Sequence, residues 1–218
     1  MMGHTHFTFG ALFAATAVHL GYAEPTVAFF MGAQLGSLAP DLDHPSALLS
    51  KKIPMSAYTI GLLKHRTLTH SILGMAIVYA LGKYLFPVLW SWIYPWLLDQ
   101  AAGYAVQIES ARQYLAGLLG DGFLWGFMIG YASHIIIDLF NPMGVQLFYP
   151  FDFLPNKGWV HPPFGWGIKT GSIWELVFTV VSLVVATFIE PKVGMMTAAI
   201  AIAFWYVIGK PGLPRYRL

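Results

Sequence analysis

Six apolar runs, separated by polar residues, glycine or proline, leave this chain few ways to fold. Hydrophobic residues make up 57% of the 218 positions and charged residues only 10%, whereas about 25% are charged in an ordinary soluble domain. One soluble core of this length cannot bury so much apolar surface. The pattern therefore predicts an all-α, polytopic membrane helical bundle.

We expect about six transmembrane or membrane-embedded helices, and residues 1–218 to form one integral-membrane domain. Several runs are shorter than the roughly 20 residues of a free-standing span, so the first two are expected to form a helical hairpin that turns at Glu24 and Pro25. Residues 87–116 mix tryptophan with charged side chains, which is typical of interfacial segments. The predicted spans are Phe7–Tyr22, Thr26–Ala39, Ser71–Phe86, Leu118–Phe140, Ile173–Ile189 and Val193–Ile208.

The basic residues predict which side of the membrane each loop occupies. Six crossings place both termini and the loops 40–70 and 141–172 on one side, together with nine of the twelve lysines and arginines. By the positive-inside rule that side is cytoplasmic, so an inner-membrane location is predicted. The N-terminus has no Lys or Arg before its apolar run and no small-residue cleavage pattern, and we expect the first helix to be retained. The nine residues are Lys51, Lys52, Lys64, Arg66, Lys157, Lys169, Lys210, Arg215 and Arg217.

Charge and cysteine content exclude several functions. Twelve basic against ten acidic residues give a formal net charge of +2, too weak and too dispersed for a nucleic-acid interface. The chain has no cysteine, which excludes disulfides, thiol nucleophiles and cysteine-based zinc sites. A transition metal must therefore bind to His, Asp or Glu.

Histidines and aspartates gather at the ends of four predicted segments. On the six-span topology these ends reach one membrane face. Ionisable side chains at membrane depth are costly and usually serve an ion, a substrate or a proton path. The histidines and aspartates at these four ends supply enough nitrogen and oxygen ligands for one metal with an open position, or for two metals. The candidates are His6, Asp41, Asp43, His65, His70, His134 and Asp138.

Two of these motifs have metal-ligand spacing. His134 and Asp138 are four residues apart in a predicted helix, so they share one helical face and either hold one ion or hydrogen-bond to each other. Asp41 and Asp43 lie between two prolines that disfavour helix, so both carboxylates can face one centre. The alternative for the aspartates is a solvated helix end, which the helix dipole disfavours.

The segment 65–71, just before the third span, holds the groups expected to act on a substrate. Arg66 can bind a phosphate or carboxylate in bidentate fashion, or it is an ordinary headgroup anchor. Asp43 or His65, whichever is not a metal ligand, is expected to act as general base or acid.

The order of these motifs resembles a family of bacterial membrane-bound, metal-dependent hydrolases of the SOS-regulated inner-membrane type, which is distantly similar to zinc-dependent phospholipases C. The resemblance implies one or two divalent ions, with zinc expected, held by Asp41 or Asp43, His70, His134 and Asp138, and by His6 as a further ligand. The later ligands of the soluble relatives have only His161 and Glu175 as counterparts, not at a matching spacing. The matching stretches are Thr5–Phe7, Ala39–Pro45, His65–Ser71, Gly130–Asp138 and Asn141–Pro150.

These observations predict a membrane-embedded metal-dependent hydrolase that cleaves a phosphate ester of a lipid or another membrane-associated substrate. A metal-activated water at the cytoplasmic interface would be the nucleophile. Its expected partners are the bilayer and a lipid substrate, and not nucleic acid. A divalent-cation or proton transporter would use the same cluster, but it needs ligands near mid-membrane and access from both sides. A metal that only staples the helices together is the third possibility.

Overall fold

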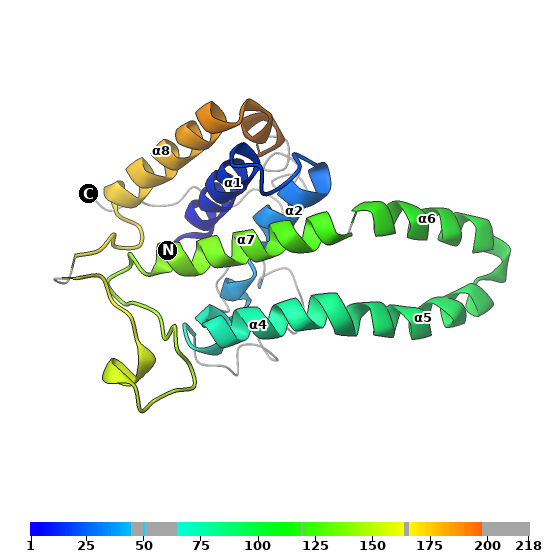
Figure 1. Ribbon diagram of the computed structural model, residues 1–218, viewed down its shortest axis with the longest axis horizontal. Coiled ribbons are helices and arrows are strands. Elements are labelled where there is room, and N and C mark those ends of the chain that lie inside the picture. The colour runs from blue at the N-terminus through cyan, green and yellow to red at the C-terminus, as the bar shows by residue number, and fades with distance from the viewer. Residues whose placement is uncertain (45–49, 51–64, 119, 164–165, 198–218) are drawn as a thin grey trace.

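The structure, a computed structural model, describes residues 1–44, 50, 65–118, 120–163 and 166–197 (Figure 1). The described part is helical, with one isolated β-bridge between Val145 and Val160. This confirms the all-α prediction. Most of the sixth predicted span, Val193–Ile208, lies outside the described residues.

The first two helices form the expected hairpin. Helix α1 covers Gly3–His19 and α2 covers Val27–Gly36, so the chain turns around Pro25. The side chain of Thr26 accepts the Phe29 N–H at 3.2 Å and thereby caps α2. The prediction of a short helical hairpin with its turn at this place is confirmed.

Helix α7, Asp121–Asp138, crosses α2 at backbone contact distance. Gly32 and Gly36 on α2 lie against the backbone carbonyls of Phe123 and Phe127 on α7, while Gly126 and Gly130 on α7 lie against the carbonyls of Phe29 and Ala33 on α2. A methyl group at any of the four glycines would overlap an oxygen atom. Each helix thus presents two glycines four residues apart, the pattern that lets membrane helices approach closely.

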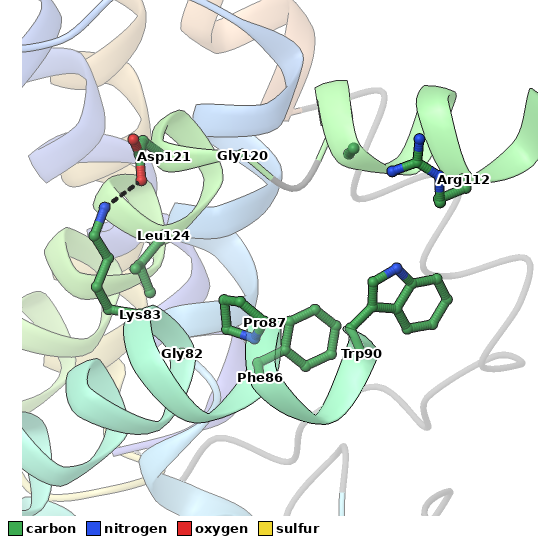
Figure 2. Close-up of a pocket in the computed structure, with 10 residues that line it drawn as sticks. Gly82, Lys83, Phe86, Pro87, Trp90, Arg112, Gly120, Asp121 and Leu124 are labelled. Atoms are coloured by element: carbon green, nitrogen blue, oxygen red, sulfur yellow. Dashed lines mark hydrogen bonds and ion pairs between the residues drawn. The ribbon is translucent and has the colours of Figure 1, made fainter. Parts of the chain in front are cut away.

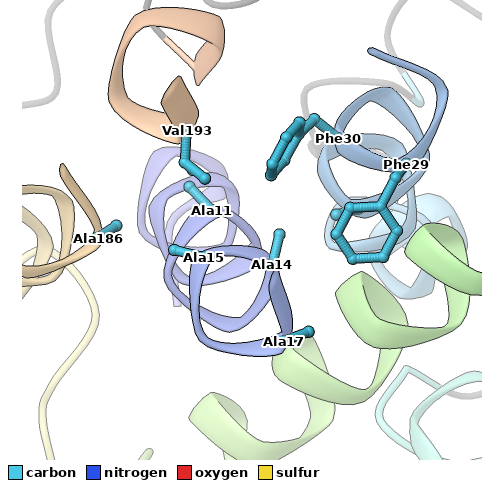
Figure 3. Packing of buried hydrophobic residues seen from close by; sticks show 9 residues of the cluster. Ala11, Ala14, Ala15, Ala17, Phe29, Phe30, Ala186 and Val193 are labelled. Carbon is cyan, nitrogen blue, oxygen red and sulfur yellow. The ribbon is translucent and has the colours of Figure 1, made fainter. Parts of the chain in front are cut away.

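Helix α8, Ile173–Ile189, has the predicted bounds and packs against α1. The second half of α1 presents alanines, which meet Ala186 of α8 on one side and Phe30 of α2 on the other (Figure 3). Nearer its start, Phe9 packs against Phe178 of α8. Small side chains again allow close helix packing.

The third predicted span does not end at Phe86. A continuous helix runs over Ile72–Gln100, made of α4 (Ile72–Ala80), a π-helical turn η3 (Leu81–Leu85) and α5 (Phe86–Gln100). Proline lacks an N–H and clashes with the preceding turn, but the wider π turn directly before Pro87 relieves that conflict. Sequence patterns do not show such a turn, which explains the wrong boundary.

The segment predicted to be interfacial is a helical hairpin. Helix α6, Ala105–Leu118, runs back beside α5, and the pair extends past the rest of the bundle (Figure 1). At its base Lys83 pairs with Asp121 at 2.8 Å, beside a cavity of about 360 Å³ (Figure 2). Among the described residues, only the helix Ile72–Gln100 is both long and apolar enough to cross a bilayer. The six-span topology therefore stays a prediction.

Candidate metal centre

Four distant segments bring their imidazole and carboxylate groups together. His6 comes from the first turns of α1, Asp41 from the 3-10 turn η1 (Pro40–Asp43) and His70 from the 3-10 turn η2 (Leu68–His70). His134 and Asp138 come from the last turns of α7. His6, His70, His134 and Asp138 are fully buried. The structure thus brings together five of the six predicted metal ligands.

The donor atoms lie at ligand-to-ligand distances around a common centre. His134 Nε2 is 3.1 Å from His70 Nε2 and 3.5 Å from Asp41 Oδ1. Asp138 contributes Oδ1 at 3.6 Å from His6 Nε2 and Oδ2 at 3.6 Å from His70 Nε2. Two ligands of a tetrahedral zinc ion are about 3.3 Å apart, given a Zn–N length of about 2.05 Å. The spacing fits an ion of this size.

Hydrogen bonds at Nδ1 fix the tautomers of His134 and His70. His134 Nδ1 lies 2.6 Å from the Ser37 carbonyl oxygen, which can only accept, so Nδ1 carries the proton. The Thr69 hydroxyl donates to Asp43 and therefore accepts from His70 Nδ1 at 3.0 Å. In the neutral form of each ring Nε2 is then unprotonated, and the two Nε2 atoms lie 3.1 Å apart. A metal ion, or a proton that His134 holds beside Asp41, fits between them, and the bonds at Nδ1 are of the kind that orients histidines for a metal.

Buried polar atoms without a partner give the strongest sign that this centre holds a ligand. Both ring nitrogens of His6 and the Oδ2 atom of Asp138 have no hydrogen-bond partner within the described part of the chain. The His6 ring stacks on that of His134 at 3.6 Å between centroids. Buried unpaired donors and acceptors are costly and rare. The donor set of neutral imidazoles and carboxylates fits a divalent metal ion.

Charge in the two 3-10 turns also favours cation binding. Burial by itself would raise the pKa of Asp41, but the nearby His134 and His70 side chains hold the pKa well below its ordinary value. Asp41 is therefore an anion. Burial lowers the pKa of His70, which keeps its imidazole neutral and able to bind a metal.

Asp43 lies one layer behind these ligands. One carboxylate oxygen is 2.7 Å from His65 Nδ1, and the other accepts the Thr69 hydroxyl and lies 3.7 Å from His70 Nδ1. The sequence predicted that Asp43 binds the ion or acts as general base or acid; this geometry instead favours a role in orienting His65 and His70. His65 is 31% exposed and is the most accessible of these histidines.

The donors also fall into two groups, and the second includes His65. His6, His134 and Asp138 form one set, while Asp41, His65 and His70 form the other; within each set the donor atoms lie within 4.8 Å of one another. The arrangement is therefore compatible with one ion or with two.

Arg66 reaches the centre from a strained backbone. Its φ of 66° lies in the left-handed region, which is uncommon for a residue other than glycine and which surrounding structure must enforce. The guanidinium donates to the Gly144 carbonyl at 3.3 Å and lies 3.6 Å from Asp138 Oδ2. The Gln146 N–H donates to the Arg66 carbonyl at 3.0 Å. A buried guanidinium beside these donors can bind an anion.

Glu175 has a positioning role that sequence reasoning missed. It is fully buried and accepts the Met2 N–H at 2.6 Å, the Thr5 hydroxyl at 2.9 Å and the Gly171 N–H at 2.6 Å. It therefore ties the start of α8 to the segment that carries His6. The available signal was the pattern Ser172-x-x-Glu175, which marks a helix start but does not show which distant groups the glutamate reaches.

Two other features lie outside the ligand set. His161 stacks on Trp159 in the segment after α7, with ring centroids 6.1 Å apart. The cavity in Figure 2 lies beside Asp121, at the opposite end of α7 from Asp138. These two aspartates are 17 residues apart on the helix, which corresponds to about 25 Å. The cavity does not belong to the candidate metal centre.

An all-helical membrane protein with a buried His/Asp centre is the class that this fold and geometry define. The chain belongs to the YdjM inner membrane protein family, whose model matches residues 1–211. This places it in the inner membrane and leaves its orientation a prediction.

Two curated relatives are similar over part of their length. The uncharacterized protein YvsG of Bacillus subtilis (strain 168) is 27% identical over 69% of this chain and 74% of its own. The inner membrane protein YdjM of Escherichia coli (strain K12) is 29% identical over 53% of this chain and 46% of its own. This chain thus spans less than half of the Escherichia coli protein. No solved structure matches, so the similarity to zinc-dependent phospholipase C stays a prediction.

Proposed function

We propose that this chain is a membrane-embedded, metal-dependent hydrolase that cleaves a phosphate ester at the cytoplasmic face of a six-span bundle. One observation carries the proposal. Three histidines and two aspartates turn their donor atoms to one buried centre, where His6 Nε2 and Asp138 Oδ2 have no hydrogen-bond partner among the described residues.

His6, Asp41, His70, His134 and Asp138 would hold the ion. A bound zinc or similar ion supplies a water of lowered pKa and polarises a phosphoryl oxygen. The site need not bind two ions for this chemistry. His65 remains available for proton transfer if only one is bound.

The residues around the ion have distinct tasks. Arg66 would bind the anionic phosphate and stabilise the extra negative charge of the transition state. Asp43 accepts the Nδ1–H of His65, which leaves His65 Nε2 free to take a proton from the attacking water. The water oxygen forms a bond to phosphorus, the bond from phosphorus to the leaving oxygen breaks, and His65 returns the proton to that oxygen. The partial exposure of His65 gives it access to substrate.

The first experiment removes a ligand and measures metal and activity together. His6→Ala should lose metal and lose activity against a panel of phosphodiesters, measured on protein purified in detergent. His19→Ala is the matched control, because His19 is an exposed histidine at the other end of the same helix. Purified wild-type protein that retains no metal would overturn the proposal.

The same variants distinguish the alternatives. If a variant loses its metal and keeps its activity, the ion has only a structural role. Metal flux through vesicles containing the wild-type protein, abolished by His6→Ala, would support a transporter instead. The hydrolase is favoured because Arg66 and the Asp43–His65 pair surround the ligands, and neither is needed to pass a cation.

A further inference from the structure

An exposed aromatic loop lies beside the candidate centre, formed by residues 148–153. Phe148, Phe151 and Phe153 are 42%, 50% and 82% exposed, and the last two rings contact edge to face at 5.5 Å. The carboxylate of Asp152 accepts the Gln146 side-chain amide at 2.9 Å. Three phenyl groups in six residues make an apolar surface of a kind that soluble proteins rarely leave uncovered.

The loop has a defined conformation. The Phe151 N–H donates to the Phe148 carbonyl at 2.9 Å, and the Leu154 N–H donates to the Phe151 carbonyl at 3.2 Å. The Phe148 N–H donates to the Gly158 carbonyl at 3.3 Å. These bonds hold the backbone while the rings point away from it. The exposure is therefore a property of a folded turn.

The loop lies at the start of a helix that is long and apolar enough to cross a bilayer. The Leu147 carbonyl accepts the N–H of Ile72, the first residue of the helix that is long enough to cross a bilayer. The aromatic loop therefore starts beside the first turn of this helix (Figure 1), and we place the headgroup layer there.

The loop is also continuous with the residues that hold Arg66. Gly144 accepts from the Arg66 guanidinium and Gln146 donates to the Arg66 carbonyl, two residues before the loop begins. Arg66 in turn lies beside Asp138 of the metal centre. A surface that contacts the aromatic loop therefore lies close to Arg66, the group proposed to bind an anion.

We propose that the aromatic loop inserts into the lipid leaflet and holds the mouth of the metal centre in the headgroup layer, so that the ligand is the phosphate group of a membrane lipid. The insertion stands on the exposure and position of the loop. The identity of the ligand rests on the proposed function.

Site-directed labelling tests the insertion directly. The chain has no cysteine, so Phe153→Cys in the full chain carries a single spin label once reconstituted into vesicles of phosphatidylcholine and phosphatidylglycerol. The label should be relaxed by dissolved oxygen and protected from a water-soluble nickel chelate. Glu24→Cys, in the exposed turn between α1 and α2, is the water-facing control and should show the reverse.

Two outcomes overturn the insertion. A Phe153 label as accessible to the nickel chelate as that at Glu24 would place the loop in water. A label shielded from both reagents would place a protein partner on it. Both results are obtained without an activity assay, so failure of the insertion is distinguishable from failure of the hydrolase proposal.

A second experiment tests the lipid ligand. Phe151→Ser combined with Phe153→Ser should lower turnover of phospholipid in vesicles by about tenfold, because the site is displaced from the headgroups. Turnover of a water-soluble short-chain phosphodiester and retention of metal should stay unchanged. An equal fall with both substrates, or none with the vesicles, would overturn the assignment.

Discussion

The two ends of helix α7 are built in opposite ways. Towards Asp138, the helix lies against the α2 backbone at Gly130 and carries the buried candidate ligands in its last turns. At Asp121 its outer side meets the base of the α5–α6 hairpin through an exposed ion pair and through Leu124, which lies against Gly82, beside a cavity (Figure 2). At Gly130 no room is left for an added methyl group, whereas the side that meets the hairpin tolerates change. The difference teaches that close packing here serves to position ligands.

The largest expected effect comes from adding one methyl group at the tight end. Gly130→Ala should destabilise the protein by about 3 kcal/mol or more, because the new Cβ would overlap the Ala33 carbonyl and neither backbone can move alone. It should also lose metal, since His134 is one turn away. Reversible unfolding in mixed micelles measures the change.

Gly103→Ala is the matched control, because no atom lies within 4 Å of the added methyl group at that position in the hairpin. It should leave unfolding and metal content unchanged. Equal stability of the two variants would show that the contrast between the ends of α7 is wrong.

A smaller effect is expected when the orientation of the histidines is disturbed. Asp43→Asn should weaken metal affinity by about 10- to 100-fold, the usual cost of losing a group that orients metal ligands. The amide keeps the shape of the carboxylate but cannot accept from both His65 and Thr69. Competition with a chromogenic chelator measures the affinity. A loss as complete as that of His134→Ala would instead make Asp43 a ligand.

Replacement of a buried carboxylate away from the ion should cost about 1–2 kcal/mol. In Glu175→Gln one side-chain oxygen acceptor becomes an N–H donor, so a buried backbone donor loses its partner. Glu109→Gln in the hairpin is the comparison, because Glu109 is only half-buried and its partners Tyr94, Arg112 and Gln113 are side chains that can turn to water; it should change less. Chemical unfolding in detergent ranks the two variants, and the opposite order would contradict the packing described here.

The smallest effect is expected at the base of the hairpin. Lys83→Met removes the ion pair with Asp121, which is exposed and therefore screened by salt. Unfolding at low and high salt should be nearly the same as for the unchanged protein, and metal content should not fall. Metal loss in this variant would mean that the two ends of α7 are coupled.

Sequence patterns predicted which ionisable side chains come together better than they predicted the packing that positions them. Ligand types are recognisable in the chain itself, and the ends of predicted helices show where His6, His134 and Asp138 can meet. The bounds of α8 followed from its apolar run. The sequence shows the glycine pairs of α2 and of α7, but it does not show that these two helices pack against each other. The reach of Glu175 to Thr5 depends likewise on which helices lie side by side.

The division between ligand and orienting group was also beyond the sequence. Asp41 and Asp43 are two residues apart and chemically identical, so spacing cannot distinguish them. Their difference arises in the 3-10 turn, which sends one carboxylate to the Nε2 atoms and the other to His65 and Thr69. A turn of this kind depends on its tertiary neighbours.

The hydrogen bond between His134 and the Ser37 carbonyl makes the geometry of the centre depend on the register of α7 against α2. Ser37 directly follows the last glycine of α2, and His134 follows the last glycine of α7 by one turn. If either helix slips along the other, the carbonyl no longer holds the ring and the nitrogen that faces the ion changes its protonation. On the proposed function, the ion would therefore bind only after these two helices have aligned.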